Sequence, residues 1–441
     1  MRLRRLLALL AAALLLAAAC GDDDGDGDTG ADVTTTTTAP EDEGEGDETE
    51  DTLPEAPDRG DADLVIWADD TRTPVLRTFA EEFGAENDVT VVVFEVAGGS
   101  TFSQIRDMLQ VAGPAGEGPD IIIGAHDWLG ELTANGAVAP IDLGAAEALL
   151  DPVALDAFRY EGQLYGLPYS IENVALIRNT ELVPDAPATF EELEEIGLQL
   201  LADGRVTTPL VIQNSPPDPF HNYPLFSAAG GYVFGETDQG YDPSDIGIDS
   251  EGGLAAARYF AGWVESGLIN PEITYDLMLE QFGNGEAAFA ITGPWAVSQE
   301  GTGFKAMGVP YVVEAVPPLA GNEARPFVGV QGFMVSAFAE NSLLAQTFLV
   351  DYMASEEAQI ALYEAGGRPP ALLSAAEAAA DDADVAGFAA AGRNGYPMPA
   401  IPEMGSVWTA WTDAYTLVFQ GSDPEQAFRD AAAQIRSQIG G

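Results

Sequence analysis

The side chains that most often bind metals or act as nucleophiles are scarce in this chain of 441 residues. Cys20 is the only cysteine, and the two histidines, His126 and His221, lie far apart in the sequence. A zinc site built from three histidines is therefore excluded, and the chain has no pair of cysteines for a disulfide. The sequence also lacks a GxxxxGK[ST] phosphate loop and a GxSxG nucleophile motif. We expect neither a metal site nor a cofactor.

One short run has the alternating carboxylates of a cation-binding loop. Asp22, Asp24 and Asp26 precede Gly27, as at the start of an EF-hand calcium loop. The twelfth position is Val33 where that loop needs a bidentate Glu, and no helical pattern flanks the run. The run therefore indicates solvated low-complexity sequence rather than a calcium site.

Residues 1–20 are typical of a secretory signal peptide. Three arginines near the start precede an unbroken apolar run of fourteen residues, Leu6 to Ala19. That run is shorter than the roughly 20 apolar residues of a membrane-spanning helix. Cys20 resembles the acylated cysteine of a bacterial lipobox, although Ala17 stands where the lipobox usually has leucine. We expect lipid anchoring through Cys20 on the extracytoplasmic face of the bacterial cell membrane, with a secreted chain or a retained helix as alternatives.

Residues 21–63 have the composition of a disordered acidic tether. They contain eighteen Asp or Glu, a single Arg (Arg59) and a run of five threonines, Thr34–Thr38. Such a segment cannot bury enough apolar surface to offset the entropy lost on ordering. A flexible coil of this length spans roughly 35 Å. We expect it to hold a folded body away from the membrane.

Residues 64–441 form an acidic body with a net charge of −41. The body has thirteen basic residues, and only one of them is a lysine, Lys305. A surface this acidic repels nucleic acid and anionic membranes, so neither is an expected partner. A body of 378 residues exceeds the size of one hydrophobic core and suggests two lobes.

Short apolar runs alternate with helical patterns along the body, which indicates an α/β fold with mostly parallel sheets covered by helices. Thr73 and Pro74 predict a helix start, followed by apolar residues at helical spacing up to Phe83. A second helix is expected over residues 189–201, with two glutamates in its first turn. The expected strands are residues 64–67, 89–96, 120–123 and 174–177.

Six blocks of sequence carry a family resemblance: Gly118–Asp127, Phe158–Pro168, Ala228–Tyr232, Phe289–Trp295, Pro326–Val330 and Met398–Met404. The first resembles a signature of bacterial extracellular solute-binding proteins. Together, in this order, they resemble maltose/maltodextrin-binding proteins, the receptors of ABC-type sugar importers. The resemblance covers nearly all of the body and implies a two-lobed α/β clamp, like periplasmic binding proteins, with crossing hinge strands. Lobe one would hold residues 64–171 plus 331–380, and lobe two residues 175–327 plus 384–441.

The resemblance also implies the ligand-binding residues. A sugar offers hydroxyls around its edge and C–H faces above and below, so its site needs carboxylates that accept hydrogen bonds and aromatic rings that cover those faces. Carboxylates that match the family's hydroxyl acceptors are Asp127, Glu172 and Asp70 or its neighbours. The other matching positions are a basic residue, an acid–aromatic pair and two stacking rings: Arg72, Asp218, Phe220, Trp295 and Trp408.

Three positions depart from the family pattern, because Gly124 and Thr409 replace aromatic residues and Trp128 replaces a basic one. Trp128 could refill the space at Gly124, and Trp411 could either substitute at Thr409 or lie in the core. Each site residue also has a purely structural alternative. Asp127 could cap a helix, Glu172 could serve in structural pairing, Asp70 and Arg72 could be surface charges, and the tryptophans could be core residues. We interpret His126 as structural.

The sequence thus predicts a non-catalytic receptor that captures maltose- or maltodextrin-type α-glucosides between two lobes and passes them to the permease subunits of an ABC importer. It is expected to act as a monomer, with the membrane contacted only through its lipid anchor. Alternatives are a receptor for trehalose or another disaccharide and a sugar sensor that does not serve transport. A glycosidase, with two carboxylates as acid and nucleophile, is the rival enzyme class.

Overall fold

The computed structural model describes residues 53–98, 102–237 and 240–440. The predicted signal peptide, Cys20 and most of the predicted tether therefore lie outside the described residues. The last part of the tether does not. Arg59 donates to Asp120 Oδ2 (2.8 Å) and lies 3.6 Å from Glu340, so residues near Arg59 pack on the body. Among the described residues, no helix is both long enough and apolar enough to cross a membrane.

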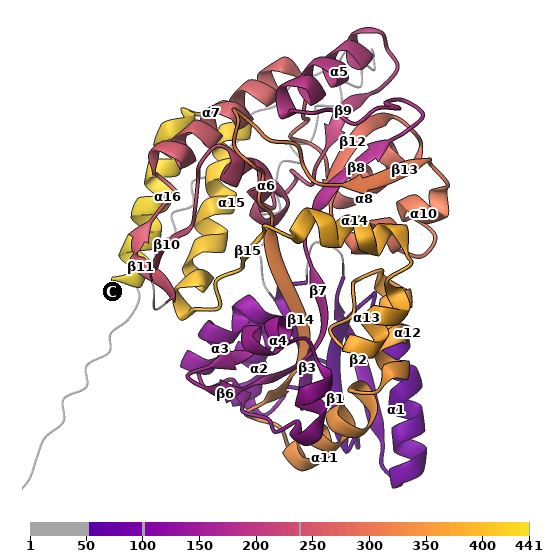
Figure 1. Cartoon of the computed structure of the whole chain (residues 1–441). Coiled ribbons are helices and arrows are strands. Elements are labelled where there is room, and N and C mark those ends of the chain that lie inside the picture. The colour runs from indigo at the N-terminus through magenta and orange to yellow at the C-terminus, as the bar shows by residue number, and fades with distance from the viewer. Residues whose placement is uncertain (1–52, 99–101, 238–239, 441) are drawn as a thin grey trace, which may run out of the picture. The chain divides into compact units, whose positions relative to one another are not determined.

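The first part of the fold is built around a mixed seven-stranded sheet (Figure 1). Its strands follow the order β15-β14-β3-β1-β2, and β4 and β7 also pair with β14. The strands are β1 (Leu64–Asp69), β2 (Val91–Ala97), β3 (Ile121–Ala125), β4 (Val138–Ala139), β7 (Gly166–Glu172), β14 (Phe327–Ser336) and β15 (Tyr396–Pro397). Helices that pack on this sheet or on one another beside it are α1 (Thr73–Asn87), α2 (Gln104–Ala115), α3 (Leu129–Ala134), α4 (Pro152–Ala157), α11 (Ser342–Phe348), α12 (Glu356–Gly366) and α13 (Leu373–Ala379). Short elements nearby are η2 (His126–Trp128), η3 (Gly144–Leu149), η4 (Leu349–Met353) and the hairpin β5 (Arg159–Tyr160)–β6 (Gln163–Leu164).

A second sheet, of four strands, follows the order β13-β8-β12-β9. Its strands are β8 (Ala175–Asn179), β9 (Thr208–Val211), β12 (Ala287–Thr292) and β13 (Tyr311–Glu314). Helices associated with it are α5 (Phe190–Ala202), α8 (Tyr275–Gly283), α9 (Pro294–Ser298), α10 (Phe304–Met307) and α14 (Ala383–Gly392). A helical group packs beside it, formed by α6 (Pro219–Ala228), α7 (Glu251–Ser266), α15 (Gly405–Phe419) and α16 (Pro424–Ile439). The hairpin β10 (Phe234–Thr237)–β11 (Gly240–Ile246) and η5 (Pro402–Met404) complete the described elements.

The mixed α/β content confirms the predicted fold class at that level, but the expectation of mostly parallel sheets is wrong. β1 pairs in parallel with β2 and β3, whereas β14 runs antiparallel to β3, β4 and β7. In the second sheet, β8 is antiparallel to both of its neighbours. Only Asn173 and Val174 separate β7 in one sheet from β8 in the other, so these consecutive strands are not joined by the crossover helix that links neighbouring parallel strands.

Local sequence explains the two helix starts that were predicted and one helix end that was not. Pro74 lies in the first turn of α1, where a missing N–H costs nothing, but Thr73 is not the predicted cap, because it is the first helical residue and its Oγ1 has no partner among the described residues. α5 begins where the side chain of Thr189 accepts a hydrogen bond from the backbone N–H of Glu192. α7 ends at Gly267, whose φ of +78° is the left-handed conformation that glycine adopts without steric cost. The ends of these helices are therefore determined locally, by hydrogen bonds to the backbone N–H groups and, at Gly267, by the absence of a Cβ.

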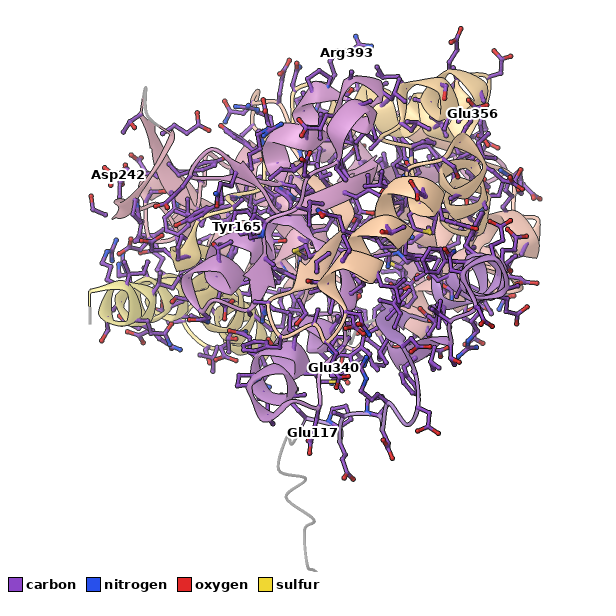
Figure 2. The ribbon with its side chains drawn as sticks, turned by 90° about the horizontal axis from the view of Figure 1, so that it is seen from below. Glu117, Tyr165, Asp242, Glu340, Glu356 and Arg393 are labelled. Atoms are coloured by element: carbon purple, nitrogen blue, oxygen red, sulfur yellow. The ribbon has the colours of Figure 1, made fainter. Side chains whose placement is uncertain are left out.

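The surface of the body carries the negative charge expected from its composition. Figure 2 shows Glu117, Glu340 and Glu356 extending outward from the ribbon, and all three side chains are exposed. Lys305 is the only lysine in the chain and lies 3.4–3.5 Å from Asp384 and Asp382. Because the acidic residues of the body far outnumber its thirteen basic residues, most of its carboxylates cannot be paired one to one with a cation.

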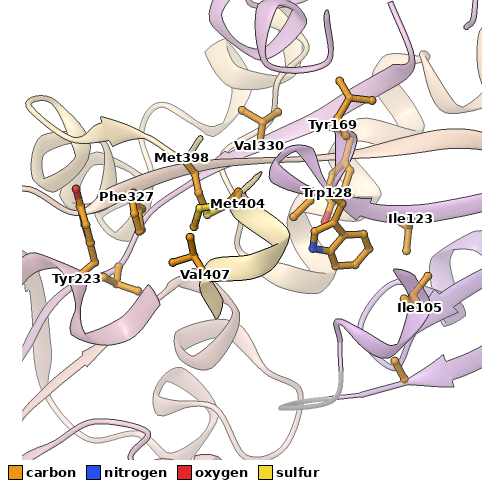
Figure 3. Close-up of a cluster of buried hydrophobic side chains, with 14 of the residues drawn as sticks. Ile105, Ile123, Trp128, Tyr169, Tyr223, Phe327, Val330, Met398, Met404 and Val407 are labelled. Carbon is orange, nitrogen blue, oxygen red and sulfur yellow. The ribbon is translucent and has the colours of Figure 1, made fainter. Parts of the chain in front are cut away.

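One hydrophobic cluster runs through the fold and reaches both sheets. Figure 3 shows it from Tyr223 and Phe327 on one side, past Met398, to Trp128 and Ile105 on the other. The Tyr223 and Phe327 rings stack with their centroids 3.4 Å apart. A second, smaller cluster holds β8, β12 and α9 together, so the elements around the functional site pack on two hydrophobic clusters.

Candidate functional site

A pocket of about 470 Å³ lies between strand ends of the first sheet on one side and the helices α6, α8, α9 and α15 on the other. Its size lies in the usual range for small-molecule sites. All eight side chains predicted to contact a ligand line this one pocket: Asp70, Arg72, Asp127, Glu172, Asp218, Phe220, Trp295 and Trp408. They come from segments spread over more than 330 positions of the sequence, so the fold brings together what the sequence keeps apart.

Asp127 follows β3 and is 5 % exposed. Its Oδ2 accepts a hydrogen bond from Nε1 of Trp408 (3.1 Å), whereas its Oδ1 is buried and has no partner among the described residues. Burial raises the pKa of Asp127 to about 6, although nearby Arg106 and the Trp408 hydrogen bond favour the ionised form. The side chain does not cap α3, so the helix-cap alternative does not hold. A buried carboxylate oxygen without a partner can accept a hydrogen bond from a ligand.

Glu172 ends β7 and is held from two directions. Its Oε1 accepts a hydrogen bond from Nε2 of Gln331 (2.7 Å), and its Oε2 accepts one from Nε of Arg368 (2.7 Å). All three residues are buried and line the pocket. The negative charge of Glu172 is therefore balanced within the protein by Arg368.

Arg72 lies just before α1 and is also buried. It forms an ion pair with Asp69, and its Nε donates to the Tyr169 hydroxyl (2.6 Å). Burial and the neighbouring cation of Arg368 lower its pKa, and its Nη2 has no partner among the described residues. Asp70, in contrast, is exposed and accepts a hydrogen bond from the Thr71 backbone N–H (2.9 Å).

Asp218 and Phe220 lie at the start of α6 on the other side of the pocket. The Asp218 side chain accepts a hydrogen bond from the Phe220 backbone N–H, which caps the helix, and it pairs with Nδ1 of His221 (2.5 Å). The Phe220 ring lies 6.1 Å from the Trp295 ring. Trp295 follows Gly293, where an added Cβ would fall 2.1 Å from the indole, so glycine is required for this indole position.

The structure distinguishes the two tryptophans of α15. Trp408 lines the pocket, whereas Trp411 is fully buried against Phe226 and Tyr415. Trp411 is therefore a core residue and does not replace the ring absent at Thr409.

Trp128 occupies the space next to Gly124. A Cβ on Gly124 would lie 2.4 Å from the Trp128 ring and 3.0 Å from Met334. The ring also packs on Phe102 (4.9 Å between centroids) and lines the pocket. The ring of Trp128 therefore fills the space beside Gly124 at the pocket wall.

His126 has a structural role, as predicted. Its Nε2 lies 3.0 Å from the Met398 carbonyl, and its Nδ1 accepts a hydrogen bond from the Val330 backbone N–H (3.0 Å). Burial lowers its pKa to about 4, so the ring is neutral at physiological pH. In the part of the chain that is described, no group of three His, Cys, Asp or Glu residues could hold a metal ion.

Sequence reasoning missed several pocket residues, among them Phe102, Tyr275, Gln331 and Arg368. None belongs to a motif with a fixed spacing. Gln331 directly follows the Pro326–Val330 block, and Arg368 follows the glycine pair at the end of α12. The signals in the sequence were weak: Gln331 is a polar residue in an apolar strand, and Arg368 directly follows two glycines.

Comparisons with known proteins show the family to which the chain is related. The profile of a family described as bacterial extracellular solute-binding protein matches residues 78–390. The galactooligosaccharide-binding protein of Bacillus subtilis is 31% identical over 390 residues, covering 86% of this chain and 90% of the relative. The maltodextrin-binding protein MdxE of the same organism is 28% identical, covering 84% and 87% of the two chains. A maltooligosaccharide ABC transporter solute-binding lipoprotein of Streptococcus pneumoniae R6 is 28% identical, covering 86% and 89%.

Proposed function

The chain belongs to the family of bacterial extracellular solute-binding proteins, and from this we propose that it is a receptor that captures maltose- and maltodextrin-type α-glucosides and delivers them to an ABC importer. Relatives named for maltodextrin and maltooligosaccharides support this ligand class. The observation that carries the proposal is the gathering of the eight predicted ligand residues in one pocket. Carboxylates there meet the hydroxyl edge of a sugar, and the rings of Phe220, Trp295 and Trp408 meet its C–H faces.

We propose that binding closes two lobes around the sugar. Lobe one comprises residues 64–171 plus 331–380, and lobe two residues 175–327 plus 384–441. The short connection between β7 and β8, together with β14, supplies the crossing strands. Asp127 and Trp408 come from different lobes in this division, as do Arg368 and Trp295. A ligand that contacts both lobes favours the closed form by its differential affinity for that form.

The chain is proposed to act outside the cytoplasm as a lipid-anchored monomer. Cys20 would carry the lipid and the acidic segment after it would serve as the tether. Two features support this: the apolar run that precedes Cys20 and a pneumococcal relative that is named as a lipoprotein. The permease subunits of the importer are the proposed protein partner. Mass spectrometry of the mature N-terminus, with Cys20→Ala as the control, tests the anchor.

Galactooligosaccharides are the second candidate ligand class, because one relative with 31% identity is named for them. The two classes present hydroxyls in different orientations, so the positions of the acceptors in the pocket decide between them. A hydrolytic role is not proposed. Incubation with maltotriose followed by chromatography for glucose checks that point.

A thermal-shift panel on the purified protein tests the proposal. The panel contains maltose, maltotriose, maltohexaose, trehalose, sucrose, cellobiose and a galactooligosaccharide. A ligand at a hundredfold excess over its dissociation constant stabilises the fold by about 2.7 kcal/mol. We expect the largest shift with maltose or a short maltodextrin. A response to the galactooligosaccharide alone would transfer the assignment to the second class, and no response to any sugar would refute the proposed function.

A further inference from the structure

Glu172 is the centre of a three-residue unit inside the pocket. Gln331 of β14 and Arg368, two residues after α12, each donate one hydrogen bond of 2.7 Å to a different carboxylate oxygen of Glu172. The exposed fractions of the three residues are 5, 5 and 6 %. The unit is electrically neutral, because the cation of Arg368 balances the anion of Glu172.

The unit leaves donors and an acceptor unused. The Oε1 of Gln331 is buried and has no hydrogen-bond partner among the described residues. Arg368 donates a hydrogen bond to the described part of the protein only through its Nε, so the N–H groups of both Nη atoms remain available to a ligand. Both side chains line the pocket. A buried acceptor without a partner is costly, so it marks a place where a ligand gains by donating a hydrogen bond.

Arg368 also reaches across to the aromatic side of the pocket. Its guanidinium carbon lies 5.3 Å from the centre of the Trp295 ring, within cation–π range. Gly366 makes this position possible, because a Cβ there would fall 2.5 Å from Nη1 of Arg368. The hydrogen-bonding unit and a proposed stacking ring are thereby joined through one side chain.

We propose that Arg368 and Gln331 are further ligand-binding residues, and that Glu172 acts mainly by positioning them. Arg368 donates from its Nη atoms and Gln331 accepts at Oε1. A sugar hydroxyl can both accept and donate, so the pair selects a neutral ligand with hydroxyls next to the face that stacks on Trp295. This inference rests on the proposed function, because it assumes a sugar in the pocket.

Titration calorimetry with the best sugar of the panel tests the assignment. Arg368→Lys keeps the charge but loses the planar fork, and we expect affinity to fall about tenfold. Gln331→Met removes the acceptor, and a similar loss of about tenfold is expected. Gly366→Ala displaces the guanidinium without removing it, and should weaken binding about threefold.

Arg178→Lys is the matched control. Arg178 is buried and pairs with Glu314 at 2.7 and 3.1 Å, but it does not line the pocket. We expect this variant to lose stability as Arg368→Lys does, while its affinity for sugar stays within about twofold of wild type. Adding Glu172→Gln to Arg368→Met should restore stability, because it removes an unpaired buried charge, but should leave binding weak.

Two different failures can be told apart. If the wild type binds a sugar and Arg368→Lys, Gln331→Met and Gly366→Ala all bind it equally well, the three residues are structural and the assignment to ligand binding is overturned. The same holds if the variant with both Arg368→Met and Glu172→Gln recovers wild-type affinity. If the wild type binds no sugar of the panel, the proposed function fails first and this inference fails with it.

Discussion

Replacing Asp127 by Asn is expected to make the ligand-free protein more stable and its sugar binding weaker. Asp127 is buried, and its pKa is raised from 3.8 to about 6 mainly because burial disfavours the ionised form. A difference between 3.8 and about 6 corresponds to about 3 kcal/mol, at about 1.4 kcal/mol for each pKa unit. The native protein carries this cost at neutral pH, and asparagine does not.

The sign of the pH dependence follows from the raised pKa. Above about pH 6 the carboxyl is ionised in both the native and the unfolded states, so the full cost is present. As pH falls from about 6 to about 4, the native state takes up the proton first and the cost disappears. Urea denaturation should therefore show Asp127→Asn more stable than wild type by about 2–3 kcal/mol at pH 7.5, and about equal to it at pH 4.

Sugar affinity should change in the opposite direction. The free Oδ1 of Asp127 accepts a ligand hydroxyl best when it is ionised, because charge-assisted hydrogen bonds are the stronger ones. Wild-type affinity should fall below about pH 6, whereas the affinity of Asp127→Asn should be weaker by about tenfold or more at pH 7.5 and independent of pH. The control is Asp413→Asn, which removes an exposed carboxylate from α15. Equal stability of Asp127→Asn and wild type at pH 7.5 would refute the argument that Asp127 is buried at a cost.

Four further outcomes are expected. Gly124→Ala should displace the Trp128 ring and cost about 1–3 kcal/mol of stability by overpacking; unchanged urea midpoints would count against the tight contact. Trp408→Ala should weaken sugar binding by about 1–3 kcal/mol in calorimetry, whereas Trp411→Ala should lower the free energy of unfolding by about 3–5 kcal/mol in urea denaturation. If Trp408→Ala lost stability and Trp411→Ala lost affinity instead, the placement of the two rings would be contradicted. Small-angle scattering should show a smaller radius of gyration with saturating sugar, and an unchanged radius would argue against lobe closure. Sodium chloride should raise the melting temperature by screening the acidic surface, and a flat or falling curve would dismiss self-repulsion.

The sequence predicted local structure well where one residue type determines the backbone. Pro74 and Thr189 mark helix starts through capping and a fixed φ, which act over one turn and need no tertiary information. The prediction of mostly parallel sheets was wrong, because an apolar run has the same pattern in a parallel and an antiparallel sheet and carries no information on strand direction. The antiparallel pairing of β14 depends on where the chain returns from the other sheet, which no local pattern records.

The location of the pocket was predicted only through the family resemblance. The residues whose types alone indicate sugar chemistry, carboxylates and large aromatics, were found in this way and line the pocket together. Arg368 was missed because a charged residue after a helix usually lies at the surface. Its burial depends on Glu172, which is 196 positions away in the chain. The helical periodicity could not show which of Trp408 and Trp411 faces the pocket, because residues three positions apart on a helix differ by only about 60° in direction.

Gly124 and Trp128 show that a binding motif should be compared by the space that its side chains fill, and not only by the residue at each position. Taken singly, each departs from the pattern expected from the family resemblance, which has a ring at position 124 and a cation at position 128. In the structure the two changes depend on each other, because a Cβ at position 124 would meet the indole at 2.4 Å. The wall therefore stays aromatic, and Arg106, 6.0 Å from the indole centre, restores a cation beside it. This part of the pocket thus holds an aromatic ring and a cation, the two groups expected from the family resemblance, although they come from other positions of the chain.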